Sequence, residues 1–410
     1  MHSISESHME ASVRGVFRTC FKPWSQSRTL PLHHHKAAHA LAHCRTEAMG
    51  VHIQRCVNGD YQSVQPNACR SRSCPRCSSL ARERWVQSQA GKLLPCSHYH
   101  MVFTLPHELL GLFGAERKVL VSVLFRSVRE TLMTLLGDKR HLGVEPGLLM
   151  ALHTWGRNLS RHPHIHVLVT DGGLSPNGQW RAPKGRYLLP VQVVKRLYRN
   201  KFLALLHDAI NRGQLTSVTA DRRPDLHRLL GRLRTKDWHV RLKERYDHGH
   251  GVMKYLARYV KDGPITDTRI VSLRDQHVTF RYRDHRDGQR KRMTLKGIDF
   301  MARLLWHLPE RYQHLVRAAG LYGNRGQHKR NQCRDSMGAG PEAVPAQLSW
   351  QAYLKQLGYR ANTACPRCGG ALESRPQSRQ NQISSIGNVS LTVFVQQTVE
   401  TDIATGPLPP

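Results

Sequence analysis

The segment His162-Pro163-His164-Ile165-His166-Val167-Leu168-Val169 carries the clearest structural signal in the chain. It ends in a run of apolar, mostly β-branched residues, which predicts a buried strand. Successive side chains of a strand point to opposite faces of the sheet, so His164 and His166 share one face while Ile165 and Val167 point into the core. Two imidazoles side by side on a sheet face supply half of a metal site.

A cation at such a site needs further ligands, and the sequence leaves the third one open. His153, on the expected neighbouring strand, is the first candidate, and His162 and Asp171 are less favoured. Two or three imidazoles leave coordination positions for phosphate oxygens and water. A divalent cation held in this way polarises a scissile phosphate, which is chemistry that a nuclease needs.

Two tyrosines one helical turn apart follow later in the chain. The spacing of apolar residues in 251–261 predicts a helix, and Tyr255 and Tyr259 lie together on the border of its apolar stripe. Lys254 and Arg258 fall on the opposite, basic face, where we expect phosphate contacts. A tyrosine oxygen can attack phosphorus and leave again, so it can cut a DNA strand and keep the bond energy for rejoining.

The other periodic segments predict an α+β fold, with a central antiparallel sheet and flanking helices. A polar link joins the second and third expected strands, which suits antiparallel neighbours. Strands are expected at residues 98–105, 148–155, 164–170, 269–273 and 277–282. Helices are expected at residues 33–49, 80–94, 109–136, 191–211, 251–261, 298–308 and 311–319.

Composition points to a polyanion as partner. Lys and Arg total 62 against 29 acidic residues, a formal net charge of +33, which favours nucleic acid. The sequence lacks an apolar run of about 18 residues that would span a membrane, and its start lacks a hydrophobic signal region. We therefore expect a cytoplasmic protein, in which clustered cysteines bind metal rather than form disulfides.

Five cysteines lie in residues 44–77. Three of them, Cys69, Cys74 and Cys77, form a C-x4-C-x2-C pattern. Structural zinc prefers four thiolates in a tetrahedron. The expected ligands of Zn²⁺ are Cys56 and these three, with Cys44 or His52 as substitutes for one of them.

Two further features of this cysteine-rich module bear on its function. Gly59 stands where a second cysteine would complete a C-x2-C pair with Cys56, so the pairing of ligands stays open. Arg70, Arg72 and Arg76 lie between the ligands, and we expect them to face outward and contact phosphates.

A second cysteine pair, Cys365 and Cys368, lies near the end of the chain. Cys333 lies upstream of it. Both a second zinc site and a lone reduced pair remain open for this pair.

These changes of pattern divide the chain into four parts. Residues 1–32 lack clear periodicity and are expected to be disordered. We expect residues 33–95 to form a zinc-binding, DNA-binding module and residues 96–325 to form a nuclease domain. Residues 326–410 form a basic segment with the second cysteine pair and a disordered tail rich in Ser, Gln, Asn and Thr.

Residues 40–325 resemble the rolling-circle transposases of the insertion-sequence-91 family, which belong to the HUH endonuclease superfamily. The resemblance lies in CRSRSCPRC, HMVFTLPHEL, LHTWGRNLSRHPHIHVLVTDGGL, KYLARYV, YRDHRDGQRKRMTL and GLYGNR. It implies a bacterial, nucleoid-associated protein with an N-terminal zinc domain followed by a nuclease domain. It also implies His164 and His166 as ligands of Mg²⁺ or Mn²⁺, Tyr255 and Tyr259 as nucleophiles, and single-stranded DNA at the ends of the element as substrate.

Two other functions fit parts of the pattern. A plasmid or phage replication initiator, or a conjugative relaxase, would use the same chemistry, but the cysteine module and the HTWG stretch favour a transposase. A non-catalytic, zinc-dependent DNA-binding protein would need only the charge and the cysteines. The expected partners are single-stranded element ends and target DNA, with self-association left open.

Overall fold

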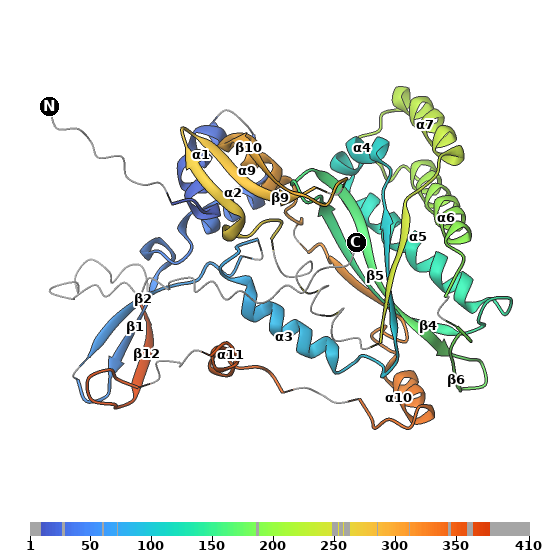
Figure 1. Cartoon of the computed structure of the whole chain (residues 1–410). Coiled ribbons are helices and arrows are strands. Elements are labelled where there is room, and N and C mark those ends of the chain that lie inside the picture. The colour runs from blue at the N-terminus through green and yellow to red at the C-terminus, as the bar shows by residue number, and fades with distance from the viewer. Residues whose placement is uncertain are drawn as a thin grey trace. The chain divides into compact units, whose positions relative to one another are not determined.

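Strand β5 (Arg161–Leu174) contains the His-x-His segment and lies at the centre of a six-stranded antiparallel sheet in the computed structural model of the chain (Figure 1). The strand order is β11-β4-β5-β3-β7, and β6 pairs with the end of β5. The other strands are β3 (His98–Thr104), β4 (Glu145–Trp155), β6 (Trp180–Arg181), β7 (Val240–Tyr246) and β11 (Val316–Gly320). The fold is α+β with a central antiparallel sheet, as expected.

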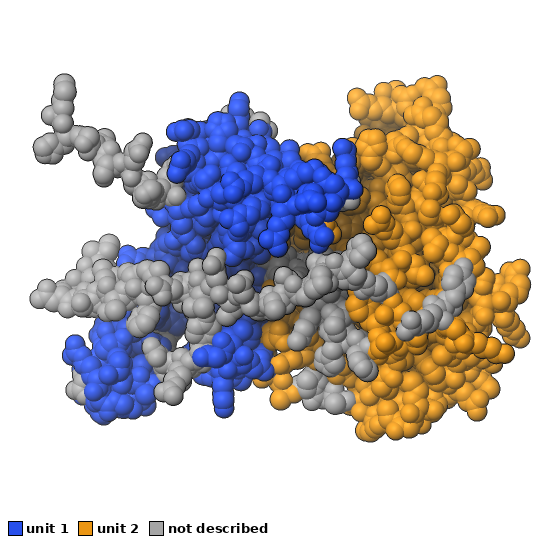
Figure 2. Space-filling view, viewed as in Figure 1, with its two compact units in different colours: residues 1–80, 265–305, 348–410 blue, residues 81–264, 306–347 orange. Residues whose placement is uncertain are grey.

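The chain forms two compact units, coloured separately in Figure 2. Unit 1 comprises residues 1–80, 265–305 and 348–410, and unit 2 comprises residues 81–264 and 306–347. The structure describes residues 10–26, 29–59, 61–71, 73–185, 188–247, 253, 257, 263–284, 286–310, 312–342, 346–358 and 364–377. The expected nuclease domain was continuous over 96–325, but residues 265–305 belong to unit 1.

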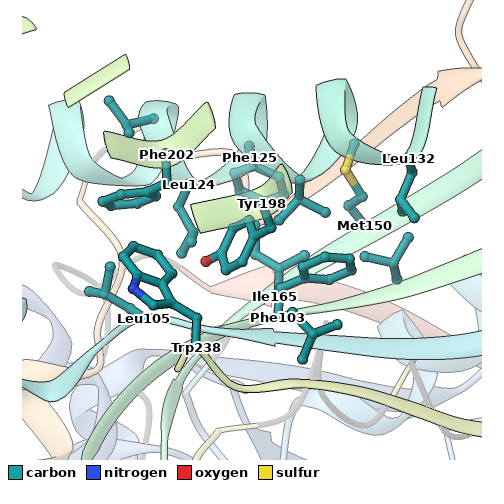
Figure 3. Close-up of a cluster of buried hydrophobic side chains, with 14 of the residues drawn as sticks. Phe103, Leu105, Leu124, Phe125, Leu132, Met150, Ile165, Tyr198, Phe202 and Trp238 are labelled. Atoms are coloured by element: carbon teal, nitrogen blue, oxygen red, sulfur yellow. The ribbon is translucent and has the colours of Figure 1, made fainter. Parts of the chain in front are cut away.

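Helices cover one face of the large sheet in unit 2. Ile165, Val167 and Val169 of β5 have no exposed surface and pack in the main hydrophobic cluster. Figure 3 shows part of this cluster, with the rings of Phe103 and Tyr198 packed together between strands and helices. The helices whose bounds the structure describes in unit 2 are α3 (Ser78–Ala90, which begins in unit 1), α4 (Leu110–Ala115), α5 (Arg117–Gly137), α6 (Val191–Asn211), α7 (Arg223–Thr235) and α10 (Gln327–Ser336), with 3₁₀ turns η2 (His107–Leu109) and η3 (Ala220–Arg222).

Unit 1 contains two small antiparallel sheets, ordered β12-β1-β2 and β10-β9-β8. Helix α1 begins beside the second sheet, where the backbone N–H of Val13 donates to Asp267 Oδ1 at 2.8 Å. The strands of these two sheets are β1 (Val51–Cys56), β2 (Gln62–Pro66), β8 (Ile270–Arg274), β9 (His277–Arg283), β10 (Arg290–Lys296) and β12 (Leu372–Gln377). Its helices and 3₁₀ turns are α1 (Val13–Gln26), α2 (Leu32–His43), η1 (Glu47–Met49), η4 (Asp267–Arg269), α9 (Gly297–Trp306) and α11 (Trp350–Gln356).

Several expectations about these elements were wrong. Helix α1 lies within residues 1–32, because Val16, Phe17 and Cys20 form an apolar face that is buried. Residues 316–320 form strand β11 rather than the end of a helix, because they pair with the edge of β4 and satisfy its backbone groups. Strand β12 lies within the expected disordered tail and pairs with β1.

Truncation of Phe103 tests the main cluster. Its ring is fully buried, 5.1 Å from the ring centroid of Tyr198, so Phe103→Ala leaves a cavity and should lower the free energy of unfolding of unit 2 by about 3–5 kcal/mol. The measurement is denaturant unfolding followed by circular dichroism. Tyr312→Ala removes an aromatic ring that is 80% exposed in the same unit and serves as control. Equal effects of the two substitutions would contradict the proposed core.

Candidate functional site

The face of the large sheet opposite the main cluster carries a group of buried histidines. His164 and His166 lie on this face of β5, and His153 of β4 is the cross-strand partner of His164. One ligand nitrogen from each of the three lies within 4.8 Å of the others, and all three side chains are buried. The antiparallel register therefore places His153 as the third member. His162 and Asp171, the less favoured candidates, are not members of this group.

The spacing of these nitrogens fits a divalent cation. His164 Nε2 lies 3.0 Å from His166 Nε2. Two ligands in adjacent octahedral positions, each about 2.1 Å from an ion, lie about 3.0 Å apart. Tetrahedral ligands at that radius would be about 3.4 Å apart. The pair thus matches adjacent octahedral positions with little rearrangement.

Hydrogen bonds on the far side of each ring orient the lone pairs. His164 Nδ1 donates to the backbone carbonyl of His162 at 2.5 Å, which leaves the Nε2 lone pair of His164 facing inward. His166 Nδ1 lies 2.8 Å from Nε2 of His100 on β3. A proton on His166 Nδ1, donated to His100, leaves both Nε2 lone pairs facing each other, and a cation between them relieves their repulsion.

The imidazoles of His164 and His166 are neutral at physiological pH. Burial is the main cause that lowers the pKa of His164 to about 3, and the neighbouring His162 is the next largest. Burial is also the main cause that holds the pKa of His166 well below its usual value, and His153 is the next largest. Neutral imidazole is the metal-binding form, so the site needs no deprotonation to accept a cation.

Two functional candidates escaped the sequence reasoning. His100 has the same one-residue spacing from His98 that links His164 to His166, so a signal was present in the strand His98–Thr104. Lys243 of β7 is exposed, and its charge lowers the pKa values of His100, His164 and His166. No sequence pattern pointed to Lys243.

The expected nucleophiles Tyr255 and Tyr259 lie outside the described residues, as do Lys254 and Arg258. Met253 and Ala257, which alternate with them in the sequence, are helical and fully buried. Both pack in a second hydrophobic cluster with Leu168. Leu168 follows His166 by two positions on β5 and shares its face of the sheet.

Four cysteines in unit 1 form a second candidate metal site. The Sγ atoms of Cys44, Cys69, Cys74 and Cys77 all lie within 4.8 Å of one another. Cys44 Sγ is 3.3 Å from Cys77 Sγ and 3.5 Å from Cys74 Sγ, and the distance from Cys69 Sγ to Cys77 Sγ is 3.8 Å. Thiolates bound tetrahedrally at about 2.3 Å from zinc would lie about 3.8 Å apart.

This group corrects the expected ligand set. Cys44, named as a substitute, takes the place of Cys56, because Cys56 lies at the end of β1 and groups with Cys365 and Cys368. His52 belongs to neither cysteine group. The change follows from the pairing of β1 with β12, which draws Cys56 toward the carboxyl-terminal segment.

Two known protein families match the parts of the chain that contain these two sites. The family described as "Transposase zinc-binding domain" matches residues 16–105, and the one described as "Putative transposase" matches residues 147–331. The chain is 37% identical to "Putative transposase y4qJ" of Sinorhizobium fredii over 368 residues, 87% of this chain and 92% of the relative. It is 32% identical to "Transposase for insertion sequence element IS801" of Pseudomonas savastanoi pv. phaseolicola over 292 residues, 69% of this chain and 68% of the relative.

The chain belongs to the insertion-sequence-91 family of transposases. Transposases of this family cleave and bind DNA, so both properties extend to this chain. The zinc-binding domain covers the four-cysteine group, which supports a structural zinc ion in this transposase. No solved structure matches the chain. Within the described ranges, the helices are too short or too polar to cross a membrane.

The arginines expected to contact DNA differ in their surroundings. Arg70 is exposed, and Arg72 lies outside the described residues. The guanidinium of Arg76 is held by two carboxylates, Asp267 at 3.0 Å and Glu10. This contradicts the expectation that Arg76 faces outward to contact phosphate, because two carboxylates already pair with its guanidinium.

A cysteine substitution tests the corrected zinc ligands. Cys44→Ser removes one of four thiolates, so this transposase should lose about one zinc ion per chain and its zinc module should unfold more easily. Zinc content by plasma mass spectrometry is the measurement. Cys96→Ser, which alters a thiol outside both groups, should leave zinc content unchanged. Full zinc retention by Cys44→Ser would return Cys56 to the ligand set.

Proposed function

We propose that this transposase nicks and rejoins single-stranded DNA at the ends of its element through a 5′-phosphotyrosine intermediate, in rolling-circle transposition. The observation that supports the proposal most directly is the group of three buried imidazoles on one face of the central sheet. Family membership supports DNA cleavage in general. The histidine group and the tyrosine sequence suggest how cleavage occurs.

His153, His164 and His166 would hold a divalent cation, Mg²⁺ or Mn²⁺. When bound, the cation polarises the scissile phosphate and neutralises charge that develops on its oxygens. The protein positions the ligands: His162 and His100 fix the ring orientations of His164 and His166. The structure groups no carboxylate of the described residues with these three rings.

Tyr255 and Tyr259 are the proposed nucleophiles. Supporting this, the neighbouring Met253 and Ala257 pack with Leu168 of the strand that bears His164 and His166. In the cut, a phenol oxygen loses its proton and bonds to phosphorus. The bond from phosphorus to the 3′ oxygen breaks, and that oxygen takes up a proton. In rejoining, a 3′ hydroxyl attacks the phosphotyrosine and the tyrosine leaves. Two tyrosines allow two strands to be held in succession.

Basic and aromatic side chains outside the histidine group are suited to contact DNA. Lys243 adds an exposed positive charge whose field reaches the histidines. In unit 1, Arg45 and Arg70 line a hollow of about 590 Å³ together with Trp350, which is 43% exposed. Guanidinium groups bind phosphate, and an exposed indole stacks on an unpaired base. We propose that Arg70 contacts DNA at this hollow.

Replacement of the tyrosines tests the covalent step. The Tyr255→Phe/Tyr259→Phe variant keeps the charge and loses the nucleophiles, so it should bind labelled single-stranded element ends and form no covalent protein–DNA band with Mn²⁺. Denaturing electrophoresis detects the band in the wild type. Tyr312→Phe, at an exposed tyrosine, is the matched control. A band of undiminished intensity in the double variant would refute the tyrosine mechanism. Absence of any band in the wild type would favour a non-catalytic, zinc-dependent DNA-binding protein.

His100 should act as a positioning residue for the cation. Because it bonds to His166 Nδ1 at 2.8 Å, His100→Ala should raise the Mn²⁺ concentration for half-maximal nicking about 10- to 100-fold, with the rate recovering at saturating Mn²⁺. His100→Gln keeps an acceptor and should retain more affinity. His166→Ala removes a ligand and should reduce nicking at all Mn²⁺ concentrations. An unchanged Mn²⁺ dependence in His100→Ala would rule out the positioning role.

A further inference from the structure

A second group of thiols joins distant parts of unit 1. Cys56 lies at the end of β1, and Cys365 and Cys368 lie in a turn just before β12. The Sγ atoms of these three cysteines all lie within 4.8 Å of one another. The antiparallel register of β1 and β12, in which Cys56 is opposite Leu372, brings these residues together. The matched zinc-binding domain covers residues 16–105 and therefore excludes two of the three.

The sulfur separation indicates metal ligation. Cys56 Sγ lies 3.4 Å from Cys368 Sγ, whereas a disulfide would require about 2.05 Å. Two thiolates on one tetrahedral zinc ion lie about 3.8 Å apart. The separations in the four-cysteine group, 3.3 to 3.8 Å, cover the same range. The two groups thus share one spacing, although only the first lies inside the known zinc domain.

Hydrogen-bond donors also point at the sulfurs. The backbone N–H of Arg367 donates to Cys365 Sγ at 3.4 Å, and the Asn58 amide donates to Cys368 Sγ at 3.5 Å. In the first group, the backbone N–H of Ser71 donates to Cys69 Sγ at 3.4 Å in the same two-residue spacing. Donors of this kind stabilise the thiolate, which is the metal-binding form of cysteine.

The small sheet that carries this group has little apolar material to stabilise it. Among the described side chains of β1, β2 and β12, only Val51, Cys56 and Ser63 are buried. So small a core contributes little hydrophobic free energy, and small structures of this kind are commonly held by metal or disulfides. A metal ion here would fasten the carboxyl-terminal strand to the amino-terminal hairpin.

We propose that Cys56, Cys365 and Cys368 bind a second zinc ion through three thiolates, with a water molecule in the fourth position. The described residues add no fourth Cys, His, Asp or Glu atom to the group. Gly59 stands three positions after Cys56, where a C-x2-C pair would supply a fourth thiolate. The open position distinguishes this ion from that of the four-cysteine group, and the proposal does not depend on the nicking mechanism.

Metal content tests the proposal on the full chain. Relative to the wild type, Cys365→Ser and Cys368→Ser should each lose about one zinc ion per chain, and so should Cys74→Ser of the first group. A Cys74→Ser/Cys368→Ser variant should lose about two. Cys96→Ser should lose none. Because each result is a difference from the wild type, zinc bound elsewhere does not affect it. Unchanged zinc in Cys365→Ser and Cys368→Ser, with loss in Cys74→Ser, would overturn the proposal.

Cobalt titration of the metal-free wild type gives a second reading that does not depend on how variants fold. Thiolates bound to Co²⁺ produce a near-ultraviolet charge-transfer band, and imidazole ligands do not contribute to it. Two thiolate sites should make this band rise until about two equivalents of Co²⁺ per chain have bound. Saturation at about one equivalent would show that only the four-cysteine group binds metal and would exclude the second site.

Discussion

The alternation of side chains along β5 is the constraint on which the rest of unit 2 depends. Ile165 and Val167 enter the main hydrophobic cluster, and His164 and His166 occupy the opposite face. Burial of imidazoles is costly unless their nitrogens find partners, and here Nδ1 of His164 donates to a backbone carbonyl and Nδ1 of His166 donates to His100. A one-residue slip in register would place histidines in the apolar cluster, so the core fixes the geometry of the site.

The charge of the histidine site complements the substrate class. Three histidine ligands would leave the full charge of a divalent cation uncompensated, because imidazole binds metal in its neutral form, whereas carboxylate ligands would offset that charge. Lys243, whose charge lowers the pKa values of His100 and His166, adds a further positive charge. A strongly positive centre suits a phosphate backbone. It also agrees with the excess of 62 basic over 29 acidic residues in the whole chain.

Local periodicity accounts for what could be predicted from the sequence. Helix α6, the β8–β9 hairpin and the shared face of His164 and His166 follow from patterns within each segment. His153 could be nominated because its strand was expected next to β5. The partner of Cys56 could not be predicted, because it depends on the pairing of β1 with a strand more than 300 positions away. The partners of Arg76 could not be predicted either, because Glu10 lies far before it in the sequence and Asp267 far after it. Strand β11 could not be predicted because it forms only by pairing with β4.

The interleaved order of the two units has a consequence for biosynthesis. Unit 1 draws on three separate stretches of chain, and β12 pairs with β1 only after the ribosome has passed residue 377. One edge of β1 in the amino-terminal hairpin therefore stays unpaired until more than 300 further residues have been synthesised. A gene interrupted by an early stop codon could still encode the large sheet with its histidines, but its product would retain an unpaired β1 edge. Such truncated copies would be prone to aggregation or degradation, so β12 links survival of the protein to translation through residue 377.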